Sequence, residues 1–392
     1  MIDWGDLETR NAPLNAFVDW DEAAAFGDGP LSDLTIGVKS NIMVAGLPWT
    51  GGMGLYRDRI AARDAEVVTR LRAAGAAILG SLNMHEAALG ATTDNVFYGR
   101  THNPHRIGHT PGGSSGGSGA AIPAGLCDVA LGTDTLGSVR IPAAYNGVYG
   151  LKPTNGAISN DGLAMLEPRF DCIGPLARDL NILARVWGVM SEGAGPFGNR
   201  PMVRMLRLEN YPVDTQPAVT TALNCALDAL PKTAAITLLD DPTAIRMAGF
   251  VAAGQWLAAE LGDWRALPAT AISDELRFLL DLTSRAEPRE DVLARTRETL
   301  LAAIGDDGVL ITPTAPQAAF AHGTRAPSNQ ADFTCIANIA GLPALAIPAG
   351  RDETGLPVSI QLVGPPHSEQ SLIDLARTLI PVLGGAQLPE GA

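Results

Sequence analysis

The sequence predicts an α/β fold, a layer of strands covered by helices, and two observations support that prediction. Strand-like and helix-like segments alternate along residues 34–131. Strand-like segments occur again near the end of the chain, after a long stretch in which apolar residues have helical spacing. Such a chain packs its helices against a sheet, because each helix and each strand has an apolar side that must be covered.

The alternating elements can be justified in chain order. Residues 34–38 form an apolar run of strand length, and residues 65–80 predict a helix followed by a short buried strand at 76–79. Three apolar residues mark the buried face of that helix: Val67, Val68 and Leu71. The small-residue run that ends at Leu126 predicts a tightly packed helix, which leads into a strand at 129–131.

The middle of the chain has a different residue pattern. Residues 216–230 and 274–304 have helical spacing and few glycines. Strand-like segments follow at three places: 309–312, 345–348 and 358–363. We therefore expect one domain over residues 1–392. Its core sheet comes from about 30–185 and 305–392, and a helical insertion occupies about 185–305.

Composition excludes several classes of protein. Of the 392 residues, 46% are hydrophobic and 18% are charged, which provides a large core and excludes intrinsic disorder. The formal charge is −14, from 28 basic and 42 acidic residues, and no stripe of Lys and Arg is present to neutralise phosphates. We therefore expect no nucleic-acid partner and a neutral or locally steered substrate.

The cysteines and the N-terminus predict a cytoplasmic protein. Four widely separated cysteines without a C-x-x-C motif fit a reducing compartment and exclude a disulfide scaffold. The first residues are acidic where a secretion signal would be basic. No apolar stretch reaches the ~18 residues of a membrane helix, so we expect no membrane partner.

The Gly/Ser loop at residues 112–118 is the most unusual segment. Its glycines allow backbone conformations that other residues resist. A flexible linker would not lead directly into a close-packing stretch, and the loop lacks the Lys-Ser/Thr pair of a phosphate-binding loop. The interpretation that remains is a rigid turn that presents hydroxyl and amide groups to a reacting centre.

Ser138 follows a second tight turn, within residues 132–142. A serine preceded by successive backbone N–H groups has the arrangement of an acyl-transfer nucleophile with an oxyanion hole. It is equally the arrangement of a turn serine that satisfies its own backbone. These residues alone leave both interpretations open.

A serine nucleophile needs a base. The G-x-S-x-G elbow of the α/β-hydrolases is absent, and His102, His105 and His109 lack a metal-binding motif, so we interpret them as polar loop residues and expect no metal. Lys39 ends an apolar strand, and burial there would lower its pKa and leave a neutral amine. The alternative is a strand-end lysine that reaches solvent.

Several separated segments resemble the amidase signature family, in the family's order. They run from about residue 15 to about residue 375, with the middle segment unmatched. The segments are 37–41 around Lys39, 80–86, 112–118, 132–142, 147–154, 312–314, 337–343, 355–357 and 361–364. The resemblance implies a mixed, mostly parallel central β-sheet sandwiched by helices.

The resemblance also implies a catalytic triad and no cofactor. Ser138 matches the acyl-forming nucleophile, Ser114 matches a bridging serine that follows a cis peptide bond, and Lys39 matches the base. The backbone N–H groups of four residues match the oxyanion hole: Thr135, Leu136, Gly137 and Ser138. Three further residues match supporting positions: Ser115, Asp134 and Arg140. Leu136 departs from the family, which usually has glycine there.

The implied function is an amidohydrolase that cleaves the C–N bond of a small amide, urea-like compound or hydrazide to an acid and ammonia or an amine. The alternatives are the glutaminase subunit of a tRNA-dependent amidotransferase and a non-catalytic binding protein of the same fold. The expected partner is a small-molecule amide. A homodimer is expected, and a small accessory subunit stays compatible with the sequence.

Overall fold

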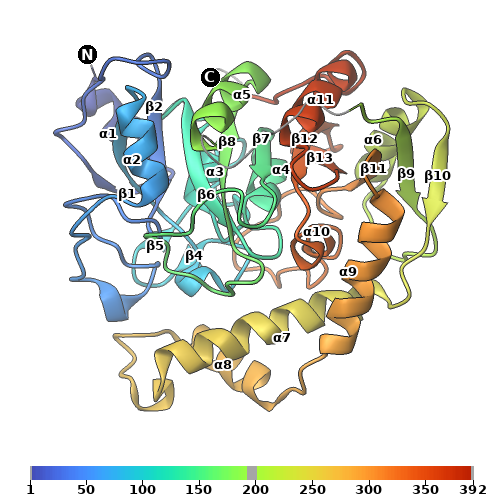
Figure 1. Ribbon diagram of the computed structural model, residues 1–392. Helices are drawn as coiled ribbons and strands as arrows, with labels where there is room; N and C mark the ends of the chain where they lie inside the picture. Colours follow the sequence, from blue (N-terminus) through green and yellow to red (C-terminus); the bar gives the residue numbers. More distant parts are fainter. Residues whose placement is uncertain (1, 192–200, 390–392) are drawn as a thin grey trace.

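The computed structural model describes residues 2–191 and 201–389. Among these residues, one twisted sheet of 11 strands runs through the molecule (Figure 1). Its order is β1 (Phe17–Trp20), β3 (Ala77–Leu82), β2 (Thr35–Lys39), β6 (Val129–Asp134), β8 (Cys172–Ala177), β7 (Tyr149–Lys152), β12 (Ala344–Arg351), β13 (Pro357–Val363), β11 (Gly308–Pro313), β9 (Arg204–Leu208) and β10 (Thr233–Ile236). A separate ribbon pairs β4 (Asp94–Asn95) with β5 (Gly99–Arg100).

The predicted mixed α/β sheet is confirmed. Parallel pairs join β3, β2 and β6 on one side and β11, β9 and β10 on the other. The centre from β6 to β11 and the edge pair β1–β3 are antiparallel. Parallel pairs are therefore fewer than the expected mostly parallel sheet implies.

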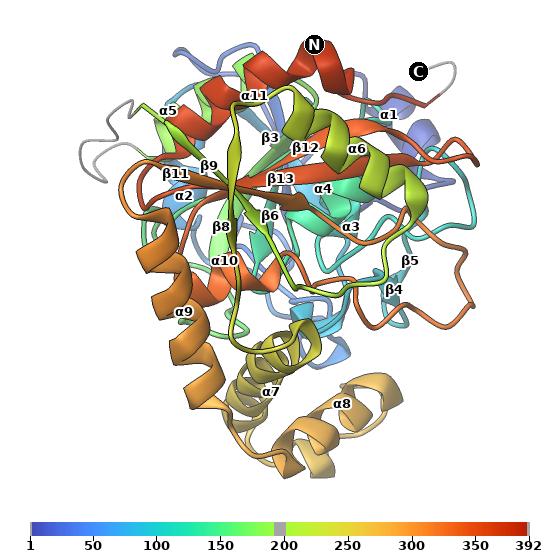
Figure 2. The same ribbon diagram turned by 90° about the vertical axis from the view of Figure 1, so that its right-hand side faces the viewer.

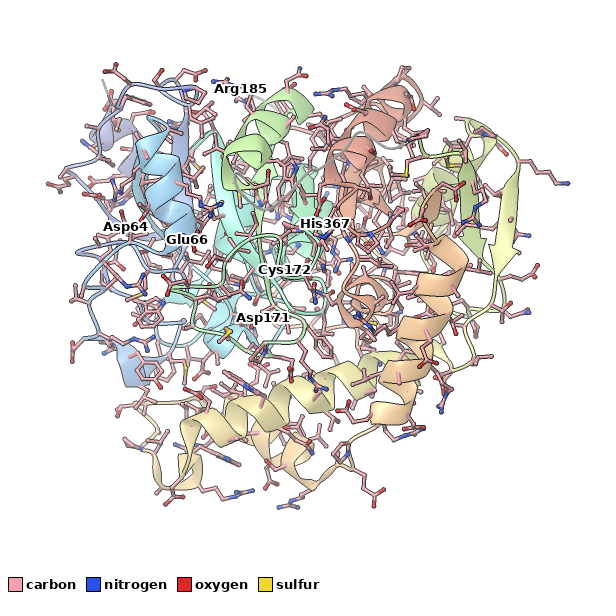
Figure 3. All side chains as sticks on the ribbon, in the orientation of Figure 1. Asp64, Glu66, Asp171, Cys172, Arg185 and His367 are labelled. Carbon is pink, nitrogen blue, oxygen red and sulfur yellow. The ribbon has the colours of Figure 1, made fainter. Side chains whose placement is uncertain are left out.

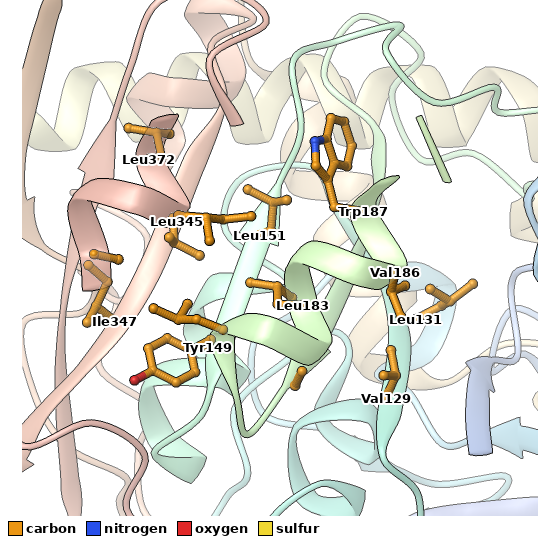
Figure 4. Packing of buried hydrophobic residues seen from close by; sticks show 14 of the residues in the cluster. Val129, Leu131, Tyr149, Leu151, Leu183, Val186, Trp187, Leu345, Ile347 and Leu372 are labelled. Atoms are coloured by element: carbon orange, nitrogen blue, oxygen red, sulfur yellow. The ribbon is translucent and has the colours of Figure 1, made fainter. Parts of the chain in front are cut away.

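Helices cover both faces of the sheet, because alternate residues of its strands point to opposite sides. On β6, Val129 and Leu131 belong to the core under α5 (Leu180–Met190), whereas Ala130 belongs to the core with α3 (Gly116–Ala121). Figure 4 shows the first of these cores, with Val129 and Leu131 near Val186. The helix layer that includes α5 also contains three other helices: α2 (Glu66–Ala73), α11 (Glu369–Leu383) and α6 (Pro217–Asp228).

The middle segment is not wholly helical, and this corrects the expected insertion at 185–305. It contributes β9 and β10, which extend the main sheet by parallel pairing to β11. These strands are only five and four residues long, and no residue of β10 is fully buried, so neither has a clear apolar period. The rest of the segment is helical and includes α7 (Pro242–Leu261), α8 (Asp274–Arg285) and α9 (Glu290–Ile304).

Helices α7 and α8 lie beyond one edge of the sheet layers, below the strand ends in both views (Figures 1 and 2). Three shorter helices complete the α-helices of the described residues: α1 (Trp4–Asn11), α4 (Arg140–Asn146) and α10 (Cys335–Ala340). Within the described ranges, no helix combines the length and the apolar character needed to cross a membrane. The arrangement places α7 beside the loops that follow β6.

Candidate active site

Lys39 is the last residue of β2 and is completely buried. Its Nζ donates to the hydroxyl oxygens of Ser114 and Thr133, both at 2.7 Å. Burial lowers the pKa of Lys39 to about 7, although the carboxylates of Asp171 and Asp134 oppose that shift. The lysine is therefore held as a potential base near neutral pH. The alternative in which it reaches solvent is wrong.

The Gly/Ser loop presents Ser114 to Lys39. Ser114 is fully buried, and the peptide bond between Gly113 and Ser114 is cis, as the resemblance implies. The carbonyl of Ser114 accepts from the backbone N–H of His85 at 2.9 Å. Gly113 has no room for a side chain, because a Cβ would lie 2.7 Å from the backbone of Ala91 and Thr92. The loop is packed on every side and is not a linker.

Ser138 lies on the turn after β6 and lines a cavity of about 330 Å³. Its carbonyl accepts from the backbone N–H of Ser115 at 3.3 Å, which ties the two loops together. Among the described residues, its hydroxyl makes no hydrogen bond to Ser114 or to any other group. The structure thus joins Lys39 to Ser114 and places Ser138 on the adjoining turn. Catalytic hydrogen bonds are often loose before substrate binds.

Three of the four predicted oxyanion donors are available. In the described part of the chain, the backbone N–H groups of Thr135, Leu136 and Ser138 make no hydrogen bond, and all three residues line the cavity. Gly137 departs from the prediction, since its N–H donates to Asp134 Oδ1 at 2.8 Å. The available set for a developing oxyanion is therefore Thr135, Leu136 and Ser138.

The supporting residues hold the loops. The Ser115 hydroxyl donates to the carbonyl of Thr133 and accepts its backbone N–H, each at 3.2 Å. Asp134 and Arg140 form a fully buried ion pair at 3.0 Å. Burial alone would raise the pKa of Asp134, but the charge and hydrogen bonds of Arg140 lower it to about 2. Asp134 is thus a permanent anion that also accepts the N–H groups of Gly137 and Val139.

Sequence reasoning missed several residues of this network. Thr133 supplies the second acceptor for Lys39, and it lies inside the family-like stretch without having been assigned a role. Asp171 precedes β8 and accepts from the Thr135 hydroxyl at 2.5 Å. Burial raises the pKa of Asp171 to about 6. Figure 3 places Asp171 beside Cys172 near the centre of the molecule. No local pattern identifies Asp171, because its partners come from other loops.

The cavity beside Ser138 is mainly apolar. Its far wall comes from α7 and α8 and includes Phe250, Leu279 and Leu282. Leu136 forms part of the wall and packs against α7, where a Cβ on Gly249 would lie 2.8 Å from Leu136 Cδ2. The only charged side chain on the described wall is Arg246, whose Nε donates to Asp332 Oδ1 at 2.6 Å.

The three loop histidines have separate environments. Nδ1 of His102 accepts from the backbone N–H of Gly108 at 3.3 Å, and Nε2 of His105 lies 3.0 Å from the carbonyl of Asn146. Nδ1 of His109 is buried without a hydrogen-bond partner. None of the three lines the cavity beside Ser138.

A family model described as amidase matches residues 11–196 and 274–373, which is most of the sequence. The chain belongs to the amidase family. Its resemblance to amidase signature enzymes is thereby confirmed, and the unmatched middle contains β9, β10 and α7. This chain is therefore an amidase-family enzyme in the broad sense, and that family contains both hydrolases and amidotransferase subunits.

Individual relatives give finer comparisons. A glutamyl-tRNA(Gln) amidotransferase subunit from Methanospirillum hungatei JF-1 is 32% identical, and the match covers 93% of this chain and 96% of the relative. A solved structure of the same subunit from Thermotoga maritima is 25% identical, with a TM-score of 0.81 and coverage of 98% and 92%. A structure of a vestigial protein complex, described as revealing the origins of an s-triazine catabolic enzyme, is 29% identical. Its TM-score is 0.86, with coverage of 98% and 95%.

Proposed function

We propose that this chain hydrolyses the C–N bond of a small amide through an acyl-enzyme on Ser138. The observation that carries the proposal is the buried Lys39, whose Nζ lies 2.7 Å from the Ser114 hydroxyl and whose pKa is lowered to about 7 by burial. A neutral amine at this position accepts a proton near neutral pH, and Ser138 lies on the adjoining turn at the cavity wall.

In each half of the proposed reaction, protons pass to Lys39 through Ser114 and then return by the same route. The Ser138 oxygen attacks the amide carbonyl while its proton passes to the Ser114 hydroxyl, whose own proton passes to Lys39. The N–H groups of Thr135, Leu136 and Ser138 stabilise the oxyanion. Lys39 then returns the proton through Ser114 to the leaving nitrogen as the C–N bond breaks. Water repeats the attack on the acyl ester and releases the acid and Ser138.

The lining of the cavity favours a substrate amide whose acyl part carries a carboxylate. Its wall is apolar apart from Arg246, and the Nε of that guanidinium already binds Asp332. Both residues of this pair are largely buried, so a charge-assisted hydrogen bond from Arg246 to a substrate carboxylate would be formed away from solvent. The apolar wall formed by Phe250 and Leu282 suits the carbon chain between the two ends.

The glutaminase subunit is the second candidate, and the names of the relatives favour it. Relatives at about one-third identity are named as subunits of glutamyl-tRNA(Gln) amidotransferase. Glutamine has a terminal carboxamide and an α-carboxylate, so it falls within the substrate class that Arg246 supports. In this case a partner protein uses the ammonia. A homodimer and a cytoplasmic location remain predictions from the sequence.

The test is ammonia release by the purified chain alone. The substrates are benzamide and butyramide, which lack a carboxylate, succinamate and glutaramate, which carry one, and glutamine. We expect turnover of the carboxylate-bearing amides. The Arg246→Gln variant should raise the KM for these amides at least tenfold and should change the KM for butyramide little. Activity that requires glutamine and a partner would select the glutaminase. Failure to react with any amide or with a fluorophosphonate would support the non-catalytic alternative.

A further inference from the structure

A second cavity, of about 220 Å³, lies apart from the cavity at Ser138. Among the described residues, the two cavities share no lining residue. Neighbouring residues of the same segments line the two cavities, since Ala87 and Met165 line the second and Ala88 and Leu166 line the first. Its volume is below the usual range for drug-sized ligands, so its ligand would be small.

Arg59 lines this second cavity, and its guanidinium packs against two aromatic rings. Its Cζ is 3.8 Å from the centroid of the Trp49 ring and 3.9 Å from that of Tyr56. Nε donates to the carbonyl of Trp49 at 2.6 Å, while Nη2 is buried without a hydrogen-bond partner. The two rings hold the guanidinium in place, and Nη2 is a donor for which the described chain supplies no acceptor. A carboxylate is the acceptor that best fits the edge of this planar group.

Asn41 supplies the complementary group. It is 2% exposed, and its Nδ2 donates to Thr133 Oγ1 at 3.2 Å and to the carbonyl of Ala164 at 3.4 Å. The carbonyl can only accept, so the amide orientation is determined and Oδ1 is the atom left without a partner. A buried acceptor of this kind costs free energy unless a donor reaches it. A ligand N–H is such a donor.

Glu260 adds a negative charge at the exposed part of the cavity. Within the described chain, it forms no ion pair with Arg59, so the cavity contains one cation and one anion that do not neutralise each other by contact. The remaining wall is apolar and aromatic, and it includes Met53, Trp256 and Leu257.

We infer that this cavity binds a small zwitterion, an α-amino acid with an apolar side chain. The α-carboxylate binds the edge of Arg59, the α-ammonium donates to Asn41 Oδ1 and is attracted by Glu260, and the side chain contacts Trp256 and Leu257. The same Asn41 amide donates to Thr133, whose hydroxyl accepts from Lys39, so the ligand would lie a short chain of hydrogen bonds from the lysine.

Titration calorimetry on the full chain tests the inference without depending on activity. The probes are L-leucine and L-phenylalanine, each beside an analogue without the ammonium (4-methylpentanoate, 3-phenylpropanoate) and one without the carboxylate (3-methylbutylamine, 2-phenylethylamine). We expect at least one amino acid to bind at millimolar concentration or below, and its two analogues to bind at least about tenfold more weakly. Absence of binding by both amino acids overturns the inference.

Variants then locate the bound amino acid. Arg59→Gln should weaken binding at least tenfold, and Arg57→Gln, an exposed arginine in the same loop, should leave it within twofold. Glu260 is exposed, so the Glu260→Gln variant should fold normally. This variant should bind the amino acid more weakly but should bind the analogue that has only the carboxylate as the wild type does. Binding that survives Arg59→Gln in a folded protein, or that is lost in Arg246→Gln, would place the ligand elsewhere and overturn the inference.

Discussion

Replacing Lys39 with arginine tests the proposed base while keeping a positive charge. Burial lowers the pKa of Lys39 from 10.5 to about 7. At pH 7 about half of such an amine is neutral, whereas only about 1 in 3000 unperturbed lysines is neutral. Burial therefore increases the available base by roughly 10³-fold. Arginine stays protonated throughout this pH range, so Lys39→Arg removes the base, and we expect turnover to fall at least about 100-fold.

The assay measures ammonia release by folded enzyme between pH 5.5 and 9. For the wild type, kcat/KM should rise about tenfold from pH 6 to pH 8 as Lys39 loses its proton, and then level off. The chain has three lysines, and the exposed Lys232 provides the matched control Lys232→Arg, which should behave as wild type. A Lys39→Arg enzyme that folds, by circular dichroism and thermal unfolding, and keeps turnover within tenfold would refute the reasoning.

Four other changes test the remaining steps. Ser138→Ala should abolish acylation and fluorophosphonate labelling, whereas Ser328→Ala, at an exposed position on the same cavity wall, should retain both; an adduct on another serine would contradict the assignment of the nucleophile. Asp171→Asn removes a charge that raises the pKa of Lys39, so the midpoint of the kcat/KM profile should move to lower pH; an unmoved or more alkaline midpoint would show that the two groups do not interact. Leu136→Gly should widen the cavity beside α7 and raise kcat/KM for bulky relative to small amides, and an unchanged ratio in a folded variant would mean that Leu136 does not limit the acyl group. Exhaustive chelation should leave turnover unchanged, because the three loop histidines have separate environments; a loss that zinc reverses would contradict this.

The central strands could be predicted, and Lys39 and the loop of Ser114 could be singled out, because their signals are local. Lys39 ends a contiguous apolar strand, and Ser114 lies in a loop whose composition is unusual by itself. The structure places their side chains 2.7 Å apart although the residues are 75 positions apart in the chain. Here the family resemblance supplied the pairing, since neither motif identifies the other.

The remaining parts of the site depend on contacts between segments without a local signal. β10 is four residues long and has no fully buried residue, so its place at the sheet edge depends on pairing with β9. Arg246 lies on α7 and is oriented by Asp332, 86 residues away. Leu136 can be seen in the sequence as a departure from the family. Its environment depends on Gly249, because a larger residue there would displace the leucine side chain.

The oxyanion turn shows why spacing alone could not select the donors. Residues 135–140 present successive N–H groups, and the sequence gives no reason to prefer one over another. Asp134 makes the selection. Its carboxylate accepts the N–H groups of Gly137, Val139 and Arg140, and those of Thr135, Leu136 and Ser138 remain without a partner in the described chain. That carboxylate stays charged because the buried Arg140 lowers its pKa. The Arg140 guanidinium is in turn held by Asn338, 198 residues away. The identity of the donors is therefore a tertiary property, set by a buried charge pair beneath the turn.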